Sequence, residues 1–143
     1  MALDREPVKL SYALRVAKEY YPKDKYDHAM RVMQYVADNE MIPYEYREEC
    51  LALAVMHDLL EDTDYKVSYG LGECFTDALK LLTKPKDMDY IEYIKEIRNT
   101  SYINWRMCAY WVKLADMKDH LTQTETLTEK LRDKYLAALP YLL

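Results

Sequence analysis

Apolar residues recur along this chain at intervals of three and four positions, which is the spacing of one face of an α-helix. Leu10, Leu14 and Ala17 show the pattern early in the chain. It predicts helices over residues 7–21, 26–40, 44–60, 73–83, 88–98, 101–121 and 127–139. No asparagine–glycine or aspartate–glycine turn joins alternating segments. We therefore expect residues 1–143 to form one all-α domain, a bundle of about seven helices.

The segment 44–60 differs from the others because it lacks a polar face in its second half. Residues 51–56 read LALAVM, so this half is apolar all around the helix. A helix of this kind lies in the middle of a domain and not on its surface. The apolar run then leads directly into HDLLEDT at residues 57–63, where charged and apolar residues alternate closely.

The charges in this motif require compensation. If the helix continues through the motif, His57 and Glu61 lie one turn apart on one face, and Asp58 and Asp62 do the same beside them. Burying unpaired carboxylates next to one another is costly. A divalent cation would offset that cost, and a mixture of imidazole and carboxylate donors suits zinc, manganese or iron.

Two further residues complete a candidate ligand set. His28 lies early in a predicted helix, and Asp116 follows the apolar run 109–112 on the buried side of another. With His57 and Asp58 they would supply two imidazoles and two carboxylates, which leaves an open position, as in catalytic metal sites. Taken singly, His28 also suits an ordinary core or surface histidine, and Asp116 also suits an ion pair with Lys113.

These motifs resemble those of the HD superfamily of metal-dependent phosphohydrolases. The similarity is closest to the hydrolase domain of RelA/SpoT-type alarmone enzymes and to their small stand-alone relatives. It spans roughly residues 11–142, and its motifs are HDLLEDT at 57–63, LLTKPKD at 81–87, VKLAD at 112–116 and LTEKLRDKYLAALPYL at 127–142.

The resemblance implies an HD-type helical bundle that acts as a hydrolase. By position it implies that His28, His57, Asp58 and Asp116 bind the metal, which is usually manganese in this branch. Glu61 and Asp62 match the acidic pair that positions and activates the attacking water. The expected reaction is removal of 3′-pyrophosphate from guanosine tetra- or pentaphosphate. The alternatives are a nucleotidase acting on another nucleoside phosphate and a binding or interaction module with a degenerate site.

The chain departs from the family pattern at positions that bear on the substrate. Asp119 and His120 stand where the family usually has histidine and asparagine, so each is a candidate for supporting the metal site or contacting substrate. For His120, metal binding and partial solvent exposure are the other possibilities. The basic, glycine-containing loop of the family is absent, which leaves Lys25 as either a phosphate contact or a solvated charge. Arg31 either contacts a phosphate or pairs with a surface acid.

Composition and charge limit the kinds of molecule that this protein is expected to bind. The net charge of −5 argues against nucleic-acid binding, which normally needs a basic face. Apolar runs fall far short of the ~18 residues of a membrane span, and charge near the N-terminus argues against a signal peptide. We expect a cytoplasmic protein that acts on a small phosphorylated nucleotide. Cys50, Cys74 and Cys108 form no CxxC motif and are expected to be buried free thiols.

Overall fold

The computed structural model describes residues 8–103 and 105–143, so residue 7 of the first predicted helix and Asn104 of the sixth lie outside the described residues. Residues 8–103 and 105–143 contain no strand, which confirms the predicted all-α class. Seven helices have nine or more residues, and α4 and the 3₁₀ turns η2 and η3 are shorter. In chain order the elements are α1 (Leu10–Tyr20), α2 (Lys23–Asp38), η2 (Tyr44–Tyr46), α3 (Arg47–Met56), α4 (Leu59–Asp62), η3 (Tyr69–Leu71), α5 (Glu73–Leu81), α6 (Tyr90–Asn99), α7 (Arg106–Thr122) and α8 (Glu129–Leu142).

Local chemistry explains where several helices begin. The side chains of Asp89 and Thr128 accept hydrogen bonds from backbone N–H groups in the first turns of α6 and α8, which would otherwise lack partners. Pro22 precedes α2, and its ring fixes φ near the helical value. The predicted link at residues 23–25 is therefore wrong, because these residues form the first turn of α2. Gly72 has φ of 79° at the start of α5, a backbone region that disfavours other residues.

The predicted continuous helix over residues 44–60 is also wrong. The segment consists of η2, α3 and α4, with the break at His57 and Asp58. Asp58 has φ of −100° and ψ of 0°, which departs from helical geometry. The Tyr21 hydroxyl lies at the break, where it donates to the Val55 carbonyl (2.9 Å) and accepts from the Asp58 N–H (3.1 Å).

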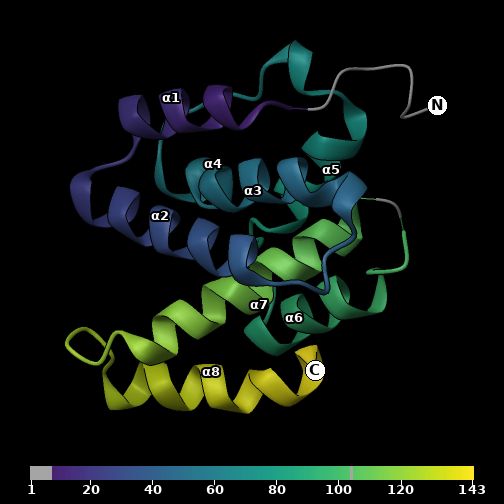
Figure 1. The fold of residues 1–143 in the computed structure, drawn as a ribbon. Helices are drawn as coiled ribbons and strands as arrows, with labels where there is room; N and C mark the ends of the chain where they lie inside the picture. The colour runs from purple at the N-terminus through teal and green to yellow at the C-terminus, as the bar shows by residue number, and fades with distance from the viewer. Residues whose placement is uncertain (1–7, 104) are drawn as a thin grey trace.

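Helices α3 and α7 form the centre of the fold. Helix α3 packs against α1, α2, α5 and α7, and α7 also contacts α2, α5, α6 and α8. Figure 1 shows α7 running through the middle of the molecule, with α1 and α8 at opposite ends. All residues of α3 from Cys50 to Met56 are buried except Leu51, which confirms that the apolar segment is central.

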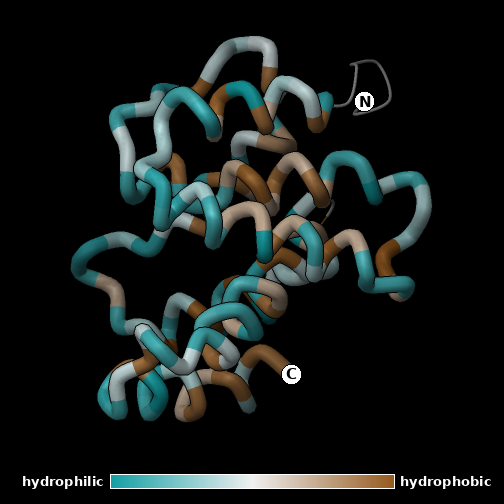
Figure 2. The backbone as a smooth tube through the Cα atoms, turned by 60° about the vertical axis from the view of Figure 1, so that its left-hand side comes forward, coloured by the Kyte–Doolittle hydropathy of each residue, from teal (hydrophilic) through white to brown (hydrophobic). Residues whose placement is uncertain are grey.

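The hydropathy of the chain follows this arrangement. In Figure 2 hydrophobic and hydrophilic stretches alternate along the helices, as expected for helices that bury one face. Cys50, Cys74 and Cys108 are free, as predicted, although Cys74 is only partly buried. Within the described residues, no helix combines the length and the apolar character needed to cross a lipid bilayer.

Candidate metal centre

The four predicted ligands lie together at the junction of three segments. His28 comes from the second turn of α2, His57 and Asp58 from the break after α3, and Asp116 from α7. One donor atom from each residue lies within 4.8 Å of the donor atoms of the other three, so the group could hold a metal ion. Both histidines and Asp116 are buried, and Asp58 is partly exposed. The predicted convergence of these residues is confirmed.

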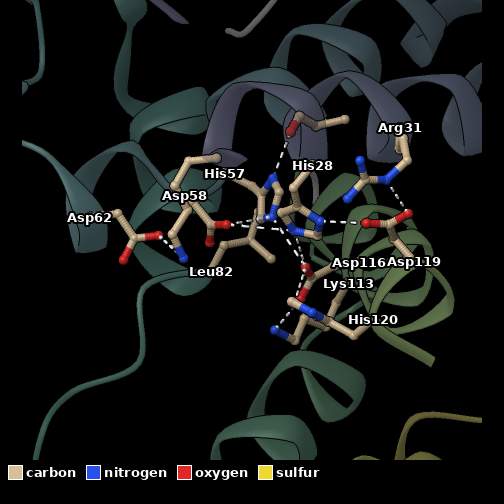
Figure 3. A network of polar contacts seen from close by, with 12 residues as sticks. His28, Arg31, His57, Asp58, Asp62, Leu82, Lys113, Asp116, Asp119 and His120 are labelled. Atoms are coloured by element: carbon tan, nitrogen blue, oxygen red, sulfur yellow. Dashed lines mark hydrogen bonds and ion pairs between the residues drawn. The ribbon is translucent and has the colours of Figure 1, made fainter. Parts of the chain in front are cut away.

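His57 is held so that one ring nitrogen faces the carboxylates. Its Nδ1 lies 2.6 Å from the carbonyl oxygen of Ala54. A carbonyl only accepts, so Nδ1 carries the proton in that bond. Nε2 then lies 3.2 Å from Asp58 Oδ2 and 3.2 Å from Asp116 Oδ1. The close polar contacts around both histidine rings are drawn in Figure 3.

His28 is oriented in the same manner by a different partner. Its Nδ1 lies 2.6 Å from Asp119 Oδ2, and its Nε2 lies 2.8 Å from Asp116 Oδ1 and 3.6 Å from Asp58 Oδ2. Asp119 is fully buried and also accepts a hydrogen bond from Arg31 Nε at 2.8 Å. Carboxylates commonly orient metal-binding histidines through such bonds. Asp119 therefore fixes the His28 ring with Nε2 toward the centre of the cluster.

Asp116 receives the largest number of polar contacts in the cluster. In addition to the contacts from His28 and His57, Oδ1 lies 3.1 Å from His120 Nε2, and Oδ2 accepts from Lys113 Nζ at 2.7 Å. Burial alone would raise the pKa of Asp116, but Lys113 and the three imidazoles hold it well below its usual 3.8. Asp116 therefore stays ionised in the interior of the protein.

The two oriented histidines leave the cluster short of positive charge. With Nδ1 protonated, the neutral form of each ring directs a lone pair from Nε2 toward carboxylate oxygens, which are also acceptors. A proton or a cation must lie between these atoms. Burial favours neutral His57, yet Asp58 and Asp116 outweigh it and raise the pKa of His57 well above 6.5. The donor set, two imidazoles and two carboxylates around one point, fits zinc, manganese or iron.

The acidic pair of the motif lies beside this cluster. The break means that His57 and Glu61 do not share a continuous helix, but the Asp62 N–H still bonds to the Asp58 carbonyl at 2.9 Å. Asp62 Oδ2 lies 3.3 Å from Lys25 Nζ, and Glu61 Oε1 accepts from the Lys84 N–H at 3.3 Å. Partial burial raises the pKa of Glu61, and the charges of Asp58 and Asp62 raise it further.

A pocket of ≈ 180 Å³ opens onto the cluster. Its walls combine acids, lysines and tyrosines with a histidine and a leucine. The lining residues are Lys25, Asp58, Glu61, Asp62, Leu82, Lys84, Tyr90, Tyr93, Lys113, Asp116, His120, Lys134 and Tyr135. The predicted ligands Asp58 and Asp116 and both members of the acidic pair thus face one shared space.

The three predicted substrate contacts fall in different places. Lys25 and His120 line both this pocket and a neighbouring one of ≈ 340 Å³, which also includes Arg31. Arg31 does not line the smaller pocket, and it pairs with the buried Asp119, which is not a surface acid. His120 is partly exposed, and its ring stacks on that of Tyr135, with the ring centroids 4.9 Å apart and the planes inclined by 12°. Whether any of the three contacts substrate stays a prediction.

Sequence reasoning missed two parts of the site. Tyr21, whose hydroxyl joins both sides of the break, gives no signal in the sequence because nothing local distinguishes it from the adjacent Tyr20. The wall formed by α6 and α8, with Tyr90, Lys134 and Tyr135, was also missed. Its residues are far from the motifs in sequence and have no spacing of their own. Asp119, by contrast, was a candidate from the sequence, and the structure places it against the predicted ligand His28 at 2.6 Å.

No model of a known protein family matches this chain, and no curated protein matches it.

Proposed function

We propose that this protein is a metal-dependent phosphohydrolase of the HD type that acts on a phosphorylated nucleotide. The observation that supports this most is the convergence of His28, His57, Asp58 and Asp116, whose donor atoms lie within 4.8 Å of one another beside an open pocket. The order and spacing of these residues in the sequence also resemble the HD superfamily. The neighbouring pocket of ≈ 340 Å³ also reaches the cluster, because His28 lines it.

The residues present fit a divalent cation. When bound, such a cation lowers the pKa of a coordinated water and offsets charge on phosphate oxygens. His57 and His28 would present Nε2 to it, because Ala54 and Asp119 engage the other ring nitrogens. From the resemblance, manganese is the metal that we propose.

The acidic pair supplies the base. Glu61 lines the pocket beside Asp58, and its pKa is raised by burial and by neighbouring acids, which makes it a better proton acceptor than an ordinary glutamate. Asp62 is held by Lys25 and would orient the water together with Glu61. A general base in this position takes the proton of the attacking water as the bond to phosphorus forms.

The substrate follows from the resemblance and from the charge of the pocket. Four lysines and four carboxylates line the pocket, and two of the lysines pair with Asp62 and Asp116. Lys84 and Lys134 have no carboxylate partner among the described residues, so they supply positive charge for phosphate groups. We propose guanosine tetra- or pentaphosphate as the substrate and the 3′-pyrophosphate as the leaving group. A nucleotidase acting on another nucleoside phosphate would use the same metal centre.

The test combines metal analysis with a substrate panel. Purified protein is loaded with manganese, dialysed and analysed for bound metal, and is then assayed on alarmones and on nucleoside mono- and triphosphates. We expect about one manganese per chain and release of pyrophosphate from the alarmone. Asp58→Ala should lose both metal and turnover, whereas Asp64→Ala, at an exposed acid just beyond the motif, should retain both.

The acidic pair is tested separately from metal binding. Glu61→Ala and Asp62→Ala should keep the metal but lower kcat by at least about 100-fold, the usual contribution of general-base catalysis. An unchanged rate would refute the assigned role of the pair. Release of free phosphate from ordinary nucleotides would identify a nucleotidase. Absence of both bound metal and turnover would favour a binding or interaction module.

A further inference from the structure

The pocket beside the cluster is lined by both carboxylates and lysines. Asp58, Glu61 and Asp62 come from the end of α3 and from α4. Lys84 and Lys134 come from the turn after α5 and from α8. A dication suits the carboxylates, and an anion suits lysines that have no carboxylate partner. Both groups line a single space of ≈ 180 Å³.

Three of the four lysines in the pocket already have fixed partners. Lys25 pairs with Asp62 at 3.3 Å, and Lys113 donates to Asp116 at 2.7 Å. Lys84 Nζ donates to the backbone carbonyls of Pro85 at 3.0 Å and Met88 at 2.9 Å, so two of its three protons are engaged. These contacts hold the turn before α6 in place.

Lys134 is different because it is held without an acceptor. Its Nζ lies 4.4 Å from the ring centroid of Tyr90 and 5.5 Å from that of Tyr135. Aromatic faces attract and position an ammonium group, but they accept no conventional hydrogen bond. Within the described part of the chain, no carboxylate lies within ion-pairing distance of this nitrogen. Its three protons are therefore available to a ligand in the pocket.

Neighbouring cations make the unpaired, charged form of Lys134 unfavourable. Partial burial lowers the pKa of Lys134, and the charges of Lys113 and Lys84 lower it further. Lys113 and Lys84 therefore repel the Lys134 ammonium, and the nearby Glu61 and Asp116 offset this only in part. An anion with several oxygens would relieve the repulsion and supply the missing acceptors.

We propose that Lys134, together with Lys84, forms an anion subsite that binds the phosphoryl group farther from the metal centre, so that Lys134 selects substrates carrying a diphosphate over monophosphates. The inference rests on the proposed phosphohydrolase function and assigns the specificity of that site. A monophosphate at the metal side would leave the Lys134 ammonium without a partner. A diphosphate adds a second phosphoryl group, whose oxygens would accept from Lys134 in the same pocket.

Calorimetric titration of the full, metal-free chain in a chelating buffer tests the subsite. The probes are inorganic pyrophosphate and inorganic phosphate. We expect pyrophosphate to bind more tightly than phosphate, and Lys134→Gln to weaken its binding about tenfold, the value of one charge-assisted hydrogen bond. Lys130→Gln is the matched control, because this exposed lysine lies one turn earlier on α8 and does not line the pocket. It should change the affinity by less than about twofold.

The outcomes separate this inference from the proposed function. Equal pyrophosphate binding by Lys134→Gln and the parent protein would overturn the subsite, even if manganese-dependent turnover is observed. Weaker pyrophosphate binding in Lys134→Gln but not in Lys130→Gln would support the subsite, even if no nucleotide is hydrolysed. In an active protein, Lys134→Gln should also raise KM for diphosphate substrates more than for monophosphates. Circular dichroism and thermal unfolding of both variants establish that the fold is intact.

Discussion

Asp119 illustrates how one buried side chain determines the geometry of a candidate ligand. Its two oxygens accept from His28 Nδ1 and from Arg31 Nε, so both are in use although the residue is fully buried. A buried carboxylate is costly unless its lone pairs are satisfied in this way. Arg31 therefore contributes to the candidate metal centre indirectly, because it holds the group that orients His28.

Replacing Asp119 should weaken metal binding without removing a ligand. In Asp119→Asn the side chain keeps its shape but loses its charge, and it cannot satisfy both His28 and Arg31. We expect manganese affinity to fall by about 10- to 100-fold, as for other groups that support metal ligands. Competition with a fluorescent chelator measures the change. Asp133→Asn, at an exposed acid on α8, is the control, and equal affinities in the two variants would contradict the role of Asp119.

At the scale of the elements, the break between α3 and α4 is the feature that builds the site. In a continuous helix, His57 and Asp58 would point in directions about 100° apart around the helix axis. The break at these residues instead lets His57 Nε2 approach Asp116 of α7, and Asp58 Oδ2 approach His28 of α2. Tyr21, at the end of α1, stabilises this arrangement with its hydroxyl.

Removal of that hydroxyl should destabilise the protein. Tyr21→Phe leaves the Val55 carbonyl and the Asp58 N–H without their partner, and an unsatisfied buried polar group costs about 1–3 kcal/mol. Urea denaturation gives the change in the free energy of unfolding. Tyr20→Phe is the matched control, since the adjacent tyrosine makes a ring contact with Tyr65. Similar losses in the two variants would mean that the hydroxyl of Tyr21 contributes nothing specific.

At the scale of the whole molecule, the candidate ligands link separate parts of the bundle. Helix α2, the end of α3 and helix α7 each supply part of the set, and α3 and α7 are the central helices. A bound cation would therefore join elements that are distant in the sequence. Unfolding must separate them, so the binding free energy adds to the stability of the native state.

Manganese should raise the thermal stability of the protein. At 100 times the dissociation constant, a ligand that binds only the native state adds about 2.7 kcal/mol. Differential scanning fluorimetry with manganese or with a chelator measures the shift in Tm. Asp58→Ala should show no shift, and Asp64→Ala should shift like the parent protein. A manganese-independent Tm in the parent would argue against the metal centre.

Alkaline pH should destabilise the bundle through its buried tyrosines. Burial raises the pKa of Tyr90, Tyr93 and Tyr135 to about 12. Above about pH 10 the unfolded chain loses phenolic protons that the native state retains, so it binds fewer protons and stability falls as pH rises. The slope is about 1.4 kcal/mol per pH unit for each such tyrosine.

The measurement is urea denaturation at several pH values, with tyrosinate absorbance followed in parallel. Stability should be retained below the ordinary tyrosine pKa and decline steeply above it. A free energy of unfolding that stays constant up to about pH 11 would contradict the prediction, because it would mean that the tyrosines titrate alike in both states.

The sequence by itself determined the helices and the chemical types in the cluster. Helical periodicity depends on contacts between residues three or four positions apart, so it is visible in the order of residues. Asp116 and the HDLLEDT motif stood out for a similar reason, since charge directly beside an apolar run signals a buried polar group. The all-α class and the four candidate ligands were thus predicted from local patterns, and the structure confirms that the four lie together.

Only the tertiary structure decided how these residues meet. The break at His57, the support of His28 by Asp119 and the lysine–tyrosine wall of α6 and α8 all depend on packing between distant segments. Tyr21 and Lys134 have no local pattern. The hydrogen-bond partners of Tyr21 lie 34 or more residues away, and the nearest ring to Lys134 Nζ, that of Tyr90, lies on another helix. Long-range contacts follow from how helices pack, and spacing along the chain does not encode that packing.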